Sequence, residues 1–158
     1  MKIVAFLQNQ WFKDPERIKR IIQDTIEKES HWKNAGEIRE YYISAFLFMG
    51  CLTGQRLMRA FGDDTCHEIV WEECSREIGG KSSAAFPADI AHMQEVVERH
   101  APQVLLVFGK IAKDAVKFLL LPSESTVITG PHPAARGPSV VGELAEMARR
   151  LQEVMAKE

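Results

Sequence analysis

The sequence lacks the cysteine spacing that zinc and iron–sulfur sites require. Its three cysteines, Cys51, Cys66 and Cys74, form no Cys-x-x-Cys pair, so zinc-ribbon and iron–sulfur patterns are absent. Their odd number favours free, partly buried thiols in a reducing compartment. The acidic and histidine residues show no metal-ligand spacing either, and we expect neither a metal ion nor a cofactor.

Long apolar runs are also missing. No stretch reaches the ~20 residues that a membrane-spanning helix needs, and the first residues resemble a strand rather than a signal peptide. We therefore expect a cytoplasmic protein without a membrane partner.

The patterns GxxxxGK[ST], GxGxxG and GxSxG are absent, which gives no support to phosphate-loop NTPases, dinucleotide enzymes or α/β-hydrolases.

Basic charge is not in excess. The chain carries 20 basic and 22 acidic residues, a net charge of −2, so its overall charge does not indicate nucleic-acid binding, although a local basic patch is compatible with it.

A length of 158 residues with 46% hydrophobic content is enough for one domain with a sizeable core. We expect a single domain over residues 1–158 and a monomer.

Strand-like and helical segments alternate along the chain. This alternation predicts an α/β fold with a four-stranded parallel sheet. Residues 38–52 are apolar without a clean period, and strand, helix and packed loop all remain open for them. The predicted strands are 2–7, 68–71, 103–108 and 125–129, and the predicted helices are 15–29, 53–61, 89–100, a segment after Gly109, and 140–156.

Three candidate residues, Asn9, Gly109 and His132, each follow a predicted strand. Ligands of parallel sheets bind beyond the carboxyl ends of the strands, so we expect these residues to lie at one end of the sheet. The amide of Asn9 both donates and accepts hydrogen bonds and suits a water or a ligand edge. The alternative is that Asn9 only satisfies the backbone of its loop.

His132 lies between Pro131 and Pro133 on a loop between a strand and a helix. Each proline fixes its own φ and restricts the preceding residue, so the histidine sits on a stiff loop. Such a histidine could donate a hydrogen bond to an oxygen that gains charge, or act as a general acid or base. The alternative is an exposed histidine on a rigid turn.

Aromatic and basic residues fall near the same positions. Trp11, Phe12, Phe46 or Phe48 could stack on a planar ligand, although core packing is favoured for the last two. Lys110 begins a helix and could hold an anion. Arg56, Arg59 and Arg136 could contact phosphates, and for the first two a solvated charged face is the favoured alternative.

Together these motifs resemble the uracil-DNA glycosylase superfamily. Residues 7–11 are similar to the motif after that family's first strand, with Asn9 at its Asp/Asn position. Residues 132–136 resemble its late His-Pro-Ser-Pro-Leu loop, with His132 at the family histidine. Residues 105–112 are similar to the family's late strand followed by Gly-Lys-x-Ala, and 54–57 resemble a helix start beside the pocket.

The chain departs from the family pattern at the residue that reads the base. Family members usually use an asparagine on a middle strand, whereas residues 70–75 contain Glu72 and Glu73 here. An ionised carboxylate accepts hydrogen bonds but cannot donate one. Gln10 also stands where a proline is usual, and Arg136 stands where many members have a leucine that fills the gap left by a flipped base.

The resemblance implies a three-layer α/β/α fold with strand order 2-1-3-4 and the excision of a damaged base from DNA, after the nucleotide is flipped from the duplex. It implies that Asn9 positions the attacking water and that His132 stabilises the departing base. DNA, or another ligand that contains a nucleobase, is the implied partner. Further implied contacts are Gln8, Gln10, Trp11, Phe48 and Glu73 to the base, and Arg136, Lys110 and Arg56 to DNA.

Two other interpretations remain open. The first keeps the fold without the chemistry, as a nucleobase, nucleotide or nucleic-acid binding module. The second is a regulatory or partner-binding α/β protein of another family, which a strand order other than 2-1-3-4 would favour.

Overall fold

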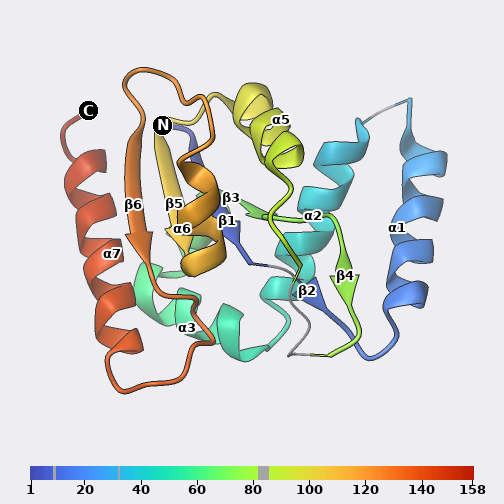
Figure 1. Ribbon diagram of the computed structural model, residues 1–158, viewed down its shortest axis with the longest axis horizontal. Coiled ribbons are helices and arrows are strands. Elements are labelled where there is room, and N and C mark those ends of the chain that lie inside the picture. Colours follow the sequence, from blue (N-terminus) through green and yellow to red (C-terminus); the bar gives the residue numbers. More distant parts are fainter. Residues whose placement is uncertain (9, 32, 82–85) are drawn as a thin grey trace.

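The computed structural model describes residues 1–8, 10–31, 33–81 and 86–158 (Figure 1). Its centre is an all-parallel sheet of four strands, in the order β3-β1-β5-β6. Counted along the chain, these four strands have the order 2-1-3-4, which confirms the expected α/β architecture. The strands are β1 (Ile3–Leu7), β3 (Ile69–Glu73), β5 (Val104–Phe108) and β6 (Thr126–Gly130).

The two inner strands, β1 and β5, are buried along their whole length. Ile3 is the register partner of Ile69 on one side and of Val104 on the other. Because helices cover both faces of a parallel sheet, such strands are continuous apolar runs rather than alternating ones. This explains why both were recognisable in the sequence.

Helices form a layer on each face of the sheet. One face packs against α2 (Ala35–Leu47), α3 (Leu52–Phe61) and α7 (Val140–Met155), and the other against α5 (Ile90–His100) and α6 (Lys110–Val116). Successive residues of β1 alternate between the two cores, with Ala5 in the first and Phe6 in the second, as the two-residue period of a strand requires. The three layers of the prediction are therefore present.

The peripheral helix α1 (Pro15–Glu29) packs on α2 and lies at the opposite end of the molecule from α7 (Figure 1). Asp14 caps it as expected, because its carboxylate accepts the N–H of Arg17. None of its described residues is buried: Ile22 and Ile26 are half-buried, and Ile21 is 37% exposed. The predicted apolar face is therefore only partly covered.

The ambiguous segment 38–52 forms most of α2 and the turn into α3. The predicted cap at Thr53 is wrong, because α3 begins at Leu52 and the sulfur of Cys51 accepts the N–H of Gly54. A Cβ at Gly54 would lie 1.8 Å from the carbonyl oxygen of Leu47. Only glycine therefore permits this close approach of α2 and α3.

Two short elements were not predicted. The helix α4 (Asp63–Glu68) leads into β3, and a separate two-stranded parallel sheet joins β2 (Gln10–Trp11) to β4 (Ile78–Gly79). This small sheet ties the segment after β1 to the polar segment after β3. Within the ranges described, no helix is both long and apolar enough to cross a bilayer.

Candidate functional site

The loop that carries His132 begins where β6 ends, at Gly130. The carbonyl of His132 accepts the N–H of Ala135 at 2.9 Å, which closes a tight turn. From α3, one guanidinium nitrogen of Arg56 donates to the carbonyl oxygens of Pro133, at 2.7 Å, and Ala135, at 3.0 Å. The prolines and this tether together hold the loop in one conformation.

Gly109 brings the end of β5 against the same loop. Its N–H donates to the carbonyl of Gly130 at 2.9 Å, and its φ of +90° is one that residues with a side chain rarely adopt. A Cβ at this position would lie 3.2 Å from the Cβ of His132. Glycine is therefore needed both for the backbone conformation and for the placement of the histidine.

The hydrogen bonds of His132 define its chemistry. Its Nδ1 accepts the N–H of Ala134 at 3.1 Å, so in the neutral ring the proton lies on Nε2. Burial lowers the pKa of His132 below its ordinary 6.5, because a desolvated imidazolium is disfavoured. At neutral pH the residue is thus an uncharged imidazole that carries its proton, and hence its donor capacity, on Nε2.

The segment after β1 reaches the same end of the sheet. Gln8 is half-buried directly after Leu7. Gln10 and Trp11 form the short strand β2, whose backbone pairs with β4. Asn9, the predicted water-positioning residue, lies outside the described residues, and its role stays a prediction.

Phe48 packs edge-on against Trp71, with ring centroids 5.7 Å apart, and stacks on His67 at 6.4 Å. It is half-buried at the end of α2 and contacts the core. These contacts match the alternative in which Phe48 packs in the core instead of stacking on a ligand. Phe46 likewise packs against Phe12, at 5.0 Å.

The predicted DNA contacts differ in their surroundings. Lys110, at the start of α6, and Arg136, on the His132 loop, are both exposed. Arg56 is half-buried, and its hydrogen bonds go to the loop itself. The structure therefore brings Arg56, from α3, and Gly109, at the junction of β5 and α6, against the loop that carries His132.

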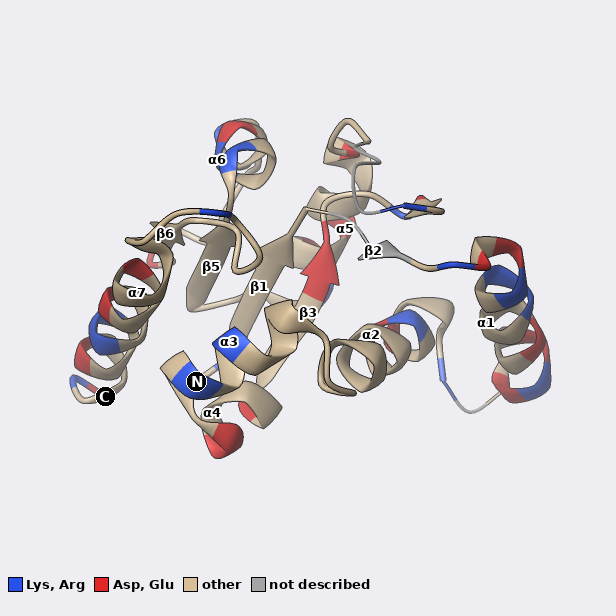
Figure 2. Cartoon of the chain, turned by 90° about the horizontal axis from the view of Figure 1, so that it is seen from below, with Lys and Arg blue, Asp and Glu red and all other residues tan. Residues whose placement is uncertain are grey.

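Glu73 lies elsewhere. It ends β3, one edge strand of the sheet, whereas His132 follows β6, the other edge strand. Figure 2 shows the acidic end of β3 between β1 and α2. Three strand spacings of ~4.8 Å separate the ends of these two strands by about 14 Å, so Glu73 and His132 lie at opposite edges of the sheet.

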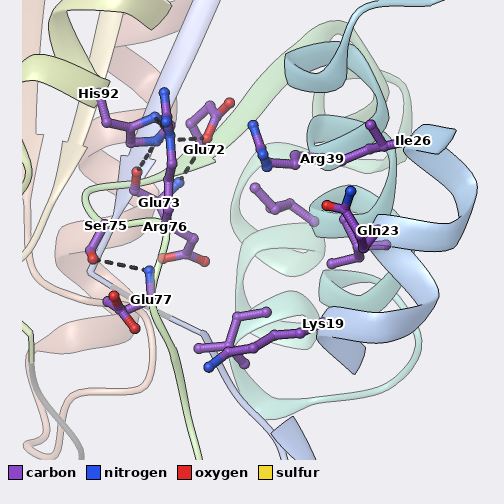
Figure 3. A pocket seen from close by; sticks show the side chains of 13 residues that line it. Lys19, Gln23, Ile26, Arg39, Glu72, Glu73, Ser75, Arg76, Glu77 and His92 are labelled. Atoms are coloured by element: carbon purple, nitrogen blue, oxygen red, sulfur yellow. Dashed lines mark hydrogen bonds and ion pairs between the residues drawn. The ribbon is translucent and has the colours of Figure 1, made fainter. Parts of the chain in front are cut away.

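Glu73 lines a cavity of about 210 Å³ that opens between β3 and the helices α1 and α2 (Figure 3). Its side chain is buried, and its Oε2 has no hydrogen-bond partner among the described residues. Burial, and then the charge of Glu72, raise the pKa of Glu73 well above 4.5. The protonated form, which can donate as well as accept a hydrogen bond, is therefore favoured over that of a solvent-exposed glutamate.

A network of ionisable groups forms part of this wall of the cavity. The Nδ1 of His92 accepts from Arg76, so its Nε2–H points to the carbonyl of Glu73, at 3.1 Å, and to the buried Glu72, at 3.4 Å. The guanidinium of Arg99 also lies beside Glu72, at 3.5 Å. Burial raises the pKa of Glu72, although His92 opposes the shift.

The network continues to α2 through Glu40, which receives hydrogen bonds from Arg99 and His100. Burial acts to raise the pKa of Glu40, but these two donors outweigh it and hold the pKa below its ordinary value. Buried charges of this kind are stable only when they are paired. Glu40, His92 and Arg99 were not singled out in the sequence, because polar residues on an amphipathic helix resemble a solvated face.

Among the described residues, no group of three or more His, Cys, Asp or Glu side chains is placed to hold a metal ion. Comparisons of the chain with protein-family models, with curated proteins and with solved structures give no match. The candidate function therefore depends on the geometry of the site and on the motif resemblance alone.

Proposed function

We propose that the end of the sheet around His132 binds a nucleobase and that the protein hydrolyses the N-glycosidic bond of a damaged base in DNA. The observation that carries this proposal is the neutral imidazole of His132, with its donor nitrogen fixed on a tethered loop. A donor oriented in advance stabilises charge that develops on an oxygen without reorganisation during the reaction.

The chemistry is a displacement at the sugar carbon. Water attacks C1′ and loses a proton to solvent, while the bond from C1′ to the base nitrogen breaks and its electron pair leaves with the base. The released base anion then takes up a proton from solvent. The Nε2–H of His132 donates to an oxygen of the departing anionic base, and Asn9 positions the water. The exposed Arg136 and Lys110 contact the phosphates of the flipped strand.

A second candidate function is nucleobase or nucleic-acid binding without base release. The position of Glu73 favours it, because the side chain expected to read the base lines a cavity at the other edge of the sheet. The interpretation as another α/β family gains no support, since the strand order is 2-1-3-4.

The two functions are separated by incubating the protein with oligonucleotides that contain uracil, hypoxanthine or xanthine. We expect abasic sites that alkali cleaves, and a loss of roughly 10²-fold or more in rate for His132→Ala, as for removal of other oxyanion donors. His31→Ala is the matched control, because this exposed histidine follows α1, the helix on the side of the molecule away from α7 (Figure 1).

Binding to DNA that weakens with salt but releases no base would support the binding module instead. Base release that is equally fast in wild type and His132→Ala would contradict the assigned role of the histidine.

A further inference from the structure

The cavity beside β3 has the size and lining of a small-molecule site. Its volume of about 210 Å³ exceeds the ~150 Å³ of an apolar cavity that accepts benzene. Four isoleucines give it apolar walls, and Figure 3 shows Glu72, Glu73 and His92 facing Arg39, Gln23 and Lys19 across it. The isoleucines are Ile22 and Ile26 of α1, Ile43 of α2 and Ile78 of β4.

One polar group of the cavity lacks a partner within the described chain. The Oε2 atom of Glu73 is buried and makes no hydrogen bond there. A buried polar atom without a partner costs about 1–3 kcal/mol, and most such atoms in native proteins are satisfied. A ligand that offers a hydrogen bond to the Glu73 carboxyl would remove this cost.

Arg39 supplies a positive charge on the facing wall of the cavity. Its half-buried side chain forms no ion pair with the described residues, whereas Arg76 pairs with Glu95 and Arg99 with Glu40. Burial, together with repulsion from Arg76, lowers the pKa of Arg39. An anion in the cavity would relieve both effects, and the guanidinium suits a carboxylate, which it can bind through two parallel hydrogen bonds.

We propose that this cavity binds a small organic monocarboxylic acid with a ring or branched body. The carboxylate pairs with Arg39 and accepts a hydrogen bond from the carboxyl of Glu73, and the body packs against Ile22, Ile26 and Ile43. A single negative charge fits better than a phosphate dianion, because Glu72 and Glu77 also line the cavity. The site lies apart from His132 and does not depend on the function proposed there.

The test uses folded protein whose isoleucine methyl groups are labelled with ¹³C. Benzoate is titrated into one sample and benzamide into another. Benzoate should shift the methyl signals of Ile22, Ile26 and Ile43 saturably, with a roughly millimolar Kd, and leave that of the core residue Ile128 unchanged. Benzamide has the same ring without the charge, and its affinity should be lower than that of benzoate by roughly tenfold or more.

Variants then assign the contact. Arg39→Met should weaken benzoate binding roughly tenfold or more, while Arg20→Met, which removes an exposed charge of α1 outside the cavity, should leave the Kd unchanged. Equal binding of benzoate and benzamide, absence of saturable shifts, or equal weakening by both variants would overturn the proposal. The ligand comparison uses wild-type protein and stays decisive even if Arg39→Met does not fold.

Discussion

Glu73 is the residue at which burial and charge conflict most directly. Its side chain is 7% exposed, and burial and the neighbouring Glu72 raise its pKa above 4.5. The folded chain therefore holds a proton on Glu73 that the unfolded chain releases at the ordinary pKa. Because the folded state binds more protons above this pH, the contribution of Glu73 to stability falls as the pH rises through the window that begins at 4.5.

Replacing Glu73 with glutamine keeps the shape and removes the ionisation. We expect Glu73→Gln to raise the free energy of unfolding at neutral pH, with a gain over wild type that grows by at most about 1.4 kcal/mol per pH unit. Urea unfolding at several values from about pH 5 to 8 measures this difference. The exposed Glu77→Gln serves as the control, and parallel pH profiles for Glu73→Gln and wild type would contradict the account.

At the scale of single elements, α5 connects a local sequence signal to the buried network. Asp89 caps this helix by accepting the N–H of His92 at 3.0 Å, and the same helix carries the side chains of His92 and Arg99 to Glu72. The cap thus fixes the first turn of a helix that compensates a buried carboxylate.

Removing this cap tests its contribution. Asp89→Ala should lower the free energy of unfolding by about 1 kcal/mol, because one N–H at the start of the helix loses its acceptor. Asp89→Asn keeps an acceptor oxygen and should lose less, as measured by urea unfolding. Equal losses in the two variants would show that the charge of Asp89, and not the cap, stabilises the helix.

The elements recognised from the sequence are those with local signals. The apolar run of β5 and the caps Asp14 and Asp89 were all readable along the chain. The helix α2 had no clean period because it is apolar on two sides: Ile43 faces the core, while Phe46 packs on Phe12. A helix buried from two sides cannot be distinguished from a strand or packed loop by periodicity.

Local sequence signals also determine which candidate site could be predicted. His132 stood out because prolines flank it in the sequence. The cavity did not, since Arg39 and Glu73 come from distant segments. Nothing local shows that Arg39 would lack an ion-pair partner among the described residues or that Glu73 would be buried. Similarly, the two hydrogen bonds from Arg56 to the loop join residues that are 77 and 79 positions apart in the sequence.

At the scale of the whole molecule, stability should be uneven. The helix α1 lies at one end, packs on α2 and contributes no buried residue, whereas β5 is buried along its whole length (Figure 1). Segments with few buried contacts open locally at low cost, while core strands open only with global unfolding.

Native-state hydrogen exchange can resolve this difference. We expect the amides of α1 to exchange through local opening, with protection well below that of β5 and α5, and with little dependence on denaturant. A ligand in the cavity should raise the protection of α1, because Ile22 and Ile26 line it. Protection of α1 equal to that of β5 would mean that the helix opens only with the whole fold.

The tether between Arg56 and the His132 loop has a consequence for how the protein tolerates change. One guanidinium nitrogen donates to two carbonyls of the loop, so a displacement of α3 would move the backbone on either side of His132 or break these hydrogen bonds. Substitutions at the junction of α2 and α3, where Gly54 touches the backbone of Leu47, therefore act on the histidine from a distance. The role proposed for His132 would therefore place a constraint on α3, a helix that the sequence marks only by its apolar face.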